Sequence, residues 1–176
     1  MINNYRQLVV FLFVVFCFAA CTQERLPCPQ PTIMSVIIGC HQVIALDTLG
    51  NPIIGDTTFS NPEIVGQDSA GFWVTGTKYP LGSKQLLAHL SPIVDSCKWV
   101  VSPDTVSYVA GITDTITFHY QHQLNFLSNA CGYAYFYNLQ SVSATHTFID
   151  SATIINASVN TNINTEHVKI YIHKHP

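Results

Sequence analysis

The chain has 176 residues, a formal net charge of -3 and a pI near 6.2. A nucleic-acid binder would show a basic stripe or a high pI, so nucleic acid is excluded as the expected partner. Only 10% of the residues are charged, and Thr, Ser, Asn and aromatic residues are abundant. This composition favours pleated strands over solvated helices.

Residues 1–20 combine one basic residue with a short apolar run. Arg6 precedes an uninterrupted apolar run over residues 8–20. That run is shorter than the roughly 20 residues that a membrane-spanning helix needs, and it fits the 7–15 residues of a signal-peptide core. It ends in "FAAC", which resembles the lipobox of bacterial lipoproteins, although Phe18 stands where Leu is usual. We therefore expect lipidation at Cys21; an ordinary secretory signal is the alternative.

Residues 21–32 are expected to form a tether behind the lipidated cysteine. The segment is polar, and its three prolines favour an extended backbone. More than one acyl chain on Cys21 would make the membrane attachment stable. Because Thr22 replaces the aspartate that retains enterobacterial lipoproteins at the inner membrane, we expect an outer-membrane lipoprotein of the cell envelope, on its periplasmic or surface face.

The number of cysteines is consistent with a lipid anchor at Cys21. Of six cysteines, Cys17 leaves with the signal peptide, and acylation would consume Cys21. An even set remains: Cys28, Cys40, Cys97 and Cys131. An oxidising compartment would join these four in two disulfides, with three connectivities open. The alternative is that one pair stays free and buried.

Residues 33–176 are expected to form a single domain. The stretch "DTITFHYQ" places Ile116, Phe118 and Tyr120 on one face, which is the alternation of a half-buried strand. Similar apolar runs recur at 32–40, 71–76, 97–102, 105–111, 131–139, 145–157 and 167–175. Turn residues separate them, so the pattern predicts an all-β fold, an antiparallel β-sandwich of about eight strands, immunoglobulin-like or related.

Two stretches of this domain are ambiguous. Residues 82–90 fit helical spacing about as well as they fit an extended run. Residues 158–166 are polar and indicate either a loop or an exposed edge.

Several short segments together carry a resemblance. They are Cys28 with "PTIMSVII", then "HLSPIVDSCKWVV", "DTITFHY", "ACGYAYFYNL" and "HVKIYI". This series resembles a family of small Bacteroidota lipoproteins known only as a domain of unknown function, over roughly residues 28–173. The resemblance implies that Cys28 is bonded to Cys131, which leaves Cys40 for Cys97, a pair outside the family pattern. It implies no known activity and no cofactor.

Eight histidines raise the question of a metal site. His173 and His175 lie two apart on a predicted strand and would project to the same side. Near the carboxyl end they are expected to be solvent-exposed instead. His119 and His122, three apart, would face opposite sides of a strand. We therefore expect no metal and no cofactor.

Catalytic motifs are absent from the sequence. It contains no G-x-S-x-G elbow, zinc helix or phosphate-binding loop. A Cys-His pair would need a free thiol. The acidic residues Asp47, Asp56, Glu63 and Asp68 crowd one loop-rich region and are expected to be solvated turn residues.

Tyr133, Tyr135 and Tyr137 alternate along one predicted strand and share a face. Buried, they would fill the sandwich core, which is the favoured interpretation. Exposed, they would form a ladder able to stack on a sugar or dock a protein.

The sequence thus predicts a non-catalytic binding or structural lipoprotein that acts with an envelope protein or a glycan. The alternative hypothesis is a small envelope hydrolase or metal-binding protein, suggested by the histidine count.

Overall fold

The computed structural model describes residues 27–30, 33–58, 63–68, 73–78, 83–103, 111–162 and 164–172. The predicted signal peptide, Cys21, most of the tether, the apolar run at 105–110, His173 and His175 lie outside these residues. In the part of the chain that the structure describes, no helix is long and apolar enough to cross a membrane.

The regular elements of the described residues are all β-strands. These are β1 (Ser35–Leu46), β2 (Pro52–Asp56), β3 (Glu63–Asp68), β4 (Trp73–Lys78), β5 (Gln85–His89), β6 (Ser96–Ser102), β7 (Asp114–Ser128), β8 (Gly132–Ala144), β9 (Ile149–Ile154), β10 (Ser158–Val159) and β11 (Val168–Ile172). The ambiguous residues 82–90 contain strand β5, and residues 158–166 contain the short strand β10 followed by a loop.

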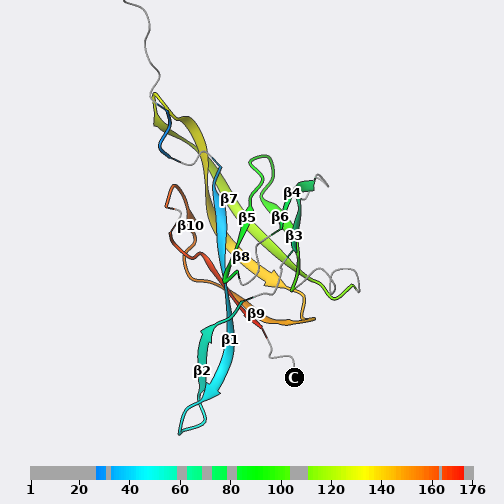
Figure 1. Ribbon diagram of the computed structural model, residues 1–176. Coiled ribbons are helices and arrows are strands. Elements are labelled where there is room, and N and C mark those ends of the chain that lie inside the picture. The colour runs from blue at the N-terminus through cyan, green and yellow to red at the C-terminus, as the bar shows by residue number, and fades with distance from the viewer. Residues whose placement is uncertain are drawn as a thin grey trace, which may run out of the picture.

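The strands form two sheets that pack against each other (Figure 1). One sheet has the order β9, β11, β1, and the other edge of β1 is shared by β5 along its first part and β2 along its second. The second sheet has the order β10, β8, β7, β6, β3, β4. The predicted all-β sandwich is confirmed.

One strand pair differs from the antiparallel prediction, because β1 and β11 run parallel. A parallel pair needs a long connection between its strands, and here almost the whole domain lies between them.

The core lies between the two sheets. Val36, Ile38 and Ile170 contribute from one sheet, and all three are fully buried. The other sheet contributes Trp99, Ile116, Phe118 and Tyr120, among others. The predicted inward face of strand β7 is therefore confirmed.

A buried carboxylate joins the start of β7 to the start of β9. Asp114 accepts hydrogen bonds from the backbone amides of Phe148 and Ile149 at 2.7 Å each and of Thr147 at 2.8 Å, and from the Thr145 hydroxyl. Burial alone would raise the pKa of Asp114, but these four hydrogen bonds together hold it below its ordinary value. The ionised carboxylate is thus the form that the fold stabilises.

Two hairpins extend beyond the sandwich at opposite ends of the molecule (Figure 1). One, formed by residues 42–56, is named the β1–β2 arm. The other, formed by residues 122–136, is named the β7–β8 arm. Strand β1 passes from the sandwich into the β1–β2 arm: its residues are buried from Val36 to His41 and exposed from Val43 onward.

A disulfide joins Cys28 to Cys131 at the tip of the β7–β8 arm, with 4.8 Å between the Cα atoms. The expected second bridge is not formed: Cys40 and Cys97 are buried thiols that take part in no disulfide. Cys40 lies on β1 and Cys97 on β6, in opposite sheets. Packed sheets are separated by about 10 Å, whereas a disulfide needs Cα atoms within about 7 Å.

Candidate functional site

The β1–β2 arm is held at its tip by an aspartate turn. The Asp47 carboxylate accepts hydrogen bonds from the backbone amides of Leu49 and Asn51 at 2.8 Å each, and from the Asn51 side chain at 2.9 Å. Gly50 supplies the positive φ of 85° that this turn requires. The bonds from Asn51 lower the pKa of Asp47, so the tip carries a negative charge at neutral pH.

Most apolar side chains of this arm are exposed. Their exposed fractions range from 42% to 85%, and the residues are Val43, Ile44, Leu46, Leu49, Ile53 and Ile54. A two-stranded hairpin of this kind is only marginally stable in water by itself. In other proteins, contiguous exposed apolar side chains are found at protein, ligand and membrane contact sites.

A β-bulge shapes the middle of the arm. The register between β1 and β2 shifts between Val43 and Ala45, so Ile44 has no partner in the ladder. The Ile44 side chain lies over Gly55, where an added Cβ would be 2.9 Å from its Cδ1. Bulges commonly re-aim a side chain, and a Cβ at position 55 would require the exposed Ile44 side chain to move.

A hollow of about 350 Å³ lies at the base of the arm. Inside it, His41 stands between two carboxylates: Nδ1 is 3.4 Å from Asp56 and Nε2 is 3.3 Å from Glu166. Lys84 approaches Asp56 at 3.8 Å. The cluster ties the arm to the sandwich through charge and hydrogen bonding.

Cys40 also borders this hollow, and because it is free it must be considered as a nucleophile. Burial raises the pKa of the Cys40 thiol to about 12, and the nearby Glu166 adds to the effect. The thiol therefore stays protonated at neutral pH. Neighbouring residues on a strand face opposite sides, so Cys40 and His41 do not form a nucleophile pair.

The three tyrosines of the predicted ladder have three different environments. Tyr137 is buried and donates a hydrogen bond to the Leu90 carbonyl at 3.1 Å. Tyr135 is half-buried beside the His122 ring, with centroids 5.7 Å apart. Tyr133 is 62% exposed and packs against Phe126, with centroids 5.2 Å apart. The ladder thus begins in the core and continues outward along the arm.

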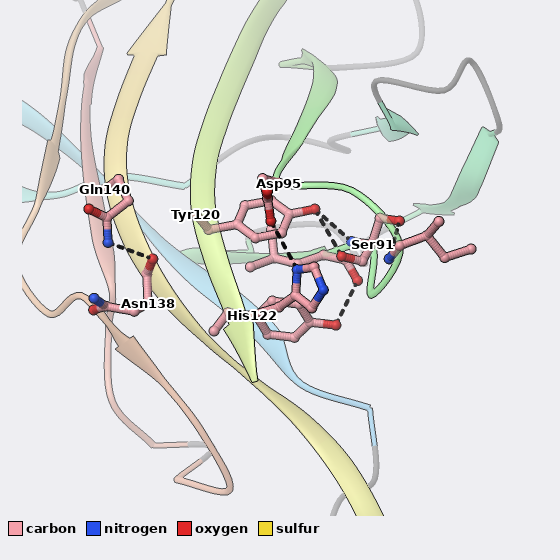
Figure 2. A network of polar contacts seen from close by, with 9 residues as sticks. Ser91, Asp95, Tyr120, His122, Asn138 and Gln140 are labelled. Carbon is pink, nitrogen blue, oxygen red and sulfur yellow. Dashed lines mark hydrogen bonds and ion pairs between the residues drawn. The ribbon is translucent and has the colours of Figure 1, made fainter. Parts of the chain in front are cut away.

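A polar network fixes the base of the β7–β8 arm (Figure 2). The Tyr120 hydroxyl accepts a hydrogen bond from the Ser91 amide at 2.9 Å and donates one to the Ser91 carbonyl at 3.1 Å. Nearby, His122 Nδ1 lies 3.0 Å from an Asp95 carboxylate oxygen. The segment after β5 is therefore bound to the strand from which the arm projects.

The other face of the same hairpin carries amide side chains. A hollow of about 530 Å³ is lined by Gln121, Gln123, Asn125, Phe136 and Asn138, together with His122, Tyr137 and Ser158. One of these amides is already engaged, because the Asn125 side chain donates to the Gln123 carbonyl at 3.0 Å.

The histidine and acidic candidates do not gather at one place. His119 is exposed, whereas His122 is half-buried on the opposite face of β7. Glu63 and Asp68 are the first and last residues of strand β3. Among the residues whose positions are described, no group of three His, Cys, Asp or Glu residues is arranged to hold a metal ion.

A comparison with protein families matches more than half of the chain. Residues 65–172 match the model of a family described as a family of unknown function (DUF6452). The chain belongs to this family. The matched residues run from β3 to the end of β11, so the β1–β2 arm lies before them. No curated protein and no solved structure matches the chain.

Proposed function

We propose that this DUF6452 protein is a non-catalytic interaction module of the bacterial cell envelope, anchored in the outer membrane by acyl chains on Cys21. Its β1–β2 arm binds a protein partner. The observation that carries the proposal is the set of six apolar side chains that this arm exposes to solvent.

The arm suits a protein partner for two reasons. Val43 is paired with Ile54 and Ala45 with Ile53, and all three large side chains are substantially exposed, so a partner can bury apolar surface on the ribbon. In addition, β2 is the end strand of its sheet among the described strands. Its outer edge presents backbone groups that an added strand can pair with.

Support for the anchor comes from the sequence. The short apolar run and the small residues before Cys21 have the features of an acylated leader. The disulfide between Cys28 and Cys131 suits an oxidising compartment outside the cytoplasm.

Site-specific photocrosslinking in intact cells tests the partner. A photoreactive residue at Leu46 or Leu49 should give a crosslink to one discrete envelope protein. Ile93 is the matched control, because it is equally exposed but lies between β5 and β6. Crosslinks that are absent from both arm positions, or equal to those at Ile93, would overturn the binding role.

Mass spectrometry of the mature protein tests the anchor separately. We expect Cys21 as the first residue, with its acyl mass added. An unmodified Cys21, or a leader still attached, would exclude the lipoprotein assignment without affecting the crosslinking result.

A second candidate function, glycan binding, is favoured by the amide-lined hollow with Phe136. Amide groups can hydrogen-bond sugar hydroxyls while an aromatic ring covers the apolar face of the sugar. Titration with cell-wall oligosaccharides should give heat that Gln123→Ala reduces; the absence of any heat would remove this candidate.

A further inference from the structure

The β7–β8 arm presents an uncharged aromatic surface. Leu124, Phe126 and Tyr133 are between 51% and 62% exposed. In the ladder, Phe126 stands opposite Tyr133 and Leu124 opposite Tyr135, so all four side chains share one face. The rings of Phe126 and Tyr133 already pack against each other, so little further ordering is needed to present them.

The absence of charge extends along the entire hairpin. Between Asp114 and Asp150 the sequence contains no Asp, Glu, Lys or Arg. Charged side chains are costly to bring into lipid, whereas tyrosine and other aromatic residues are enriched where lipid meets water. The β1–β2 arm differs, because it carries the ionised Asp47 at its tip.

The disulfide determines which arm is near the anchor. Cys28 is bonded to Cys131 at the tip of the β7–β8 arm. Seven peptide steps separate Cys21 from Cys28, and a fully extended chain spans at most about 3.6 Å per residue. The tip therefore lies within about 25 Å of an acylated Cys21, while the other arm extends from the opposite end (Figure 1).

We propose that the β7–β8 arm lies in the interface of the membrane that holds the lipid anchor, with Leu124, Phe126 and Tyr133 in contact with lipid. This inference rests on the proposed anchor at Cys21. It adds a second membrane contact and an orientation: the β1–β2 arm is directed away from the bilayer. The acyl chains of Cys21 hold the protein at the membrane, whereas contact through the arm also sets how the domain is oriented on it.

Depth-dependent quenching tests the contact in the full-length, lipidated protein. Phe126→Trp and Tyr133→Trp each add an indole on the arm face, and Leu49→Trp adds one on the opposite arm as the matched control. In vesicles that contain brominated lipids, the emission added at positions 126 and 133 should be quenched and shifted to the blue. The emission added at position 49 should be unchanged, after subtraction of the two native tryptophans.

The outcomes separate this inference from the proposed function. Equal emission at positions 126 and 49, on protein whose Cys21 acylation is verified by mass, overturns the lipid contact and leaves the anchor intact. A missing acyl group overturns the anchor itself. Circular dichroism of each variant verifies folding, and Tyr133→Trp repeats the measurement at a second position of the arm face.

Discussion

Asp114 and His167 are buried polar side chains that bind backbone amides. Asp114 accepts from three amides and one hydroxyl. His167 Nδ1 accepts from the Ile37 amide at 3.0 Å, which joins the residue before β11 to β1. In both cases a single side chain satisfies backbone donors that would otherwise be buried without partners.

Asp114→Asn should lower the free energy of unfolding by about 2 to 4 kcal/mol, because the new NH₂ group would face amide donors. Urea denaturation measures the loss. Thr145→Ser is the control, since it keeps the hydroxyl that bonds Asp114 and should cost about 1 kcal/mol or less. Equal losses in the two variants would contradict the role of the carboxylate.

The same residue contributes to acid sensitivity. The pKa of Asp114 is lowered in the folded protein, so its contribution is complete above the unfolded value of about 3.9 and is lost as the pH falls through the folded value. Asp114→Asn should therefore lose less stability than the wild type on acidification below about pH 4.

His167 predicts a pH effect at milder acidity. Burial lowers the pKa of His167, while interaction with the Ser158 backbone opposes the shift, so folding favours the neutral ring. Below the unfolded pKa of about 6.5 the unfolded chain binds more protons than the folded chain. The free energy of unfolding therefore decreases as the pH is lowered. His167→Asn retains an acceptor for the Ile37 amide, and its unfolding free energy should change less between about pH 7 and 5. Identical slopes would contradict this prediction. His89, whose pKa burial also lowers, would keep some slope in both proteins.

For individual residues, the sequence predicts only part of the observed cysteine arrangement. An even number predicts bridges, and the resemblance to a family pairs Cys28 with Cys131, as found. Cys40 and Cys97 look equivalent in sequence, because each is a small apolar residue within a strand pattern. Their placement in opposite sheets depends on the order of the strands, which alternation does not encode.

Among the elements, the end of β5 is held by three aromatic side chains. The Trp99 indole donates to the His89 carbonyl at 3.1 Å, and Tyr137 donates to Leu90 at 3.1 Å. Tyr120 bonds both backbone groups of Ser91. Burial raises the pKa of the Tyr120 hydroxyl, with Cys97 adding to the shift, so it remains a donor.

Tyr120→Phe should reduce the free energy of unfolding by about 1 to 3 kcal/mol, because the amide and carbonyl of Ser91 would lose this buried partner. Thermal denaturation measures the effect. Tyr133→Phe, on the exposed arm face, should change stability by no more than about 0.5 kcal/mol. A Tyr120→Phe variant as stable as the control would show that the hydroxyl is dispensable.

The two arms show what the sequence pattern does not predict about the strands, namely which parts of them are buried. Period-two alternation places Tyr133, Tyr135 and Tyr137 on one face, which is correct, but it does not indicate where that face leaves the core. The core interpretation is therefore correct for Tyr137 and wrong for Tyr133, because hydropathy reports the preference of a side chain, whereas exposure depends on whether a second sheet covers it. The β1–β2 arm occupies a region that the sequence indicates to be rich in loops, and Asp56 lies at the end of strand β2 instead of in a turn.

For the whole molecule, the disulfide joins residues 103 positions apart. Closing a loop of about 100 residues stabilises a protein by about 4 to 5 kcal/mol on the chain-entropy model. Cys28→Ser with Cys131→Ser should therefore lose about this amount. Denaturation with and without reductant checks it: reductant should lower wild-type stability to that of the double variant and leave the variant unchanged, since Cys40 and Cys97 form no disulfide. A variant that still responded to reductant would reveal another bridge.

Sequence patterns predict the sandwich itself because the segments 114–121 and 167–175 alternate clearly between apolar and polar residues. They do not predict the parallel pair of β1 and β11, since strand order and direction depend on contacts between distant segments.

That parallel pair has a consequence for biogenesis. Ile37 and His167, which bond across it, are 130 residues apart, so the first sheet stays incomplete until the ribosome has made the residues from 167 onward, which include β11. Contacts this distant form late and slowly. In a nascent chain at this stage the edge of β1 that pairs with β11 is still open, and the first sheet is completed only when β11 is made.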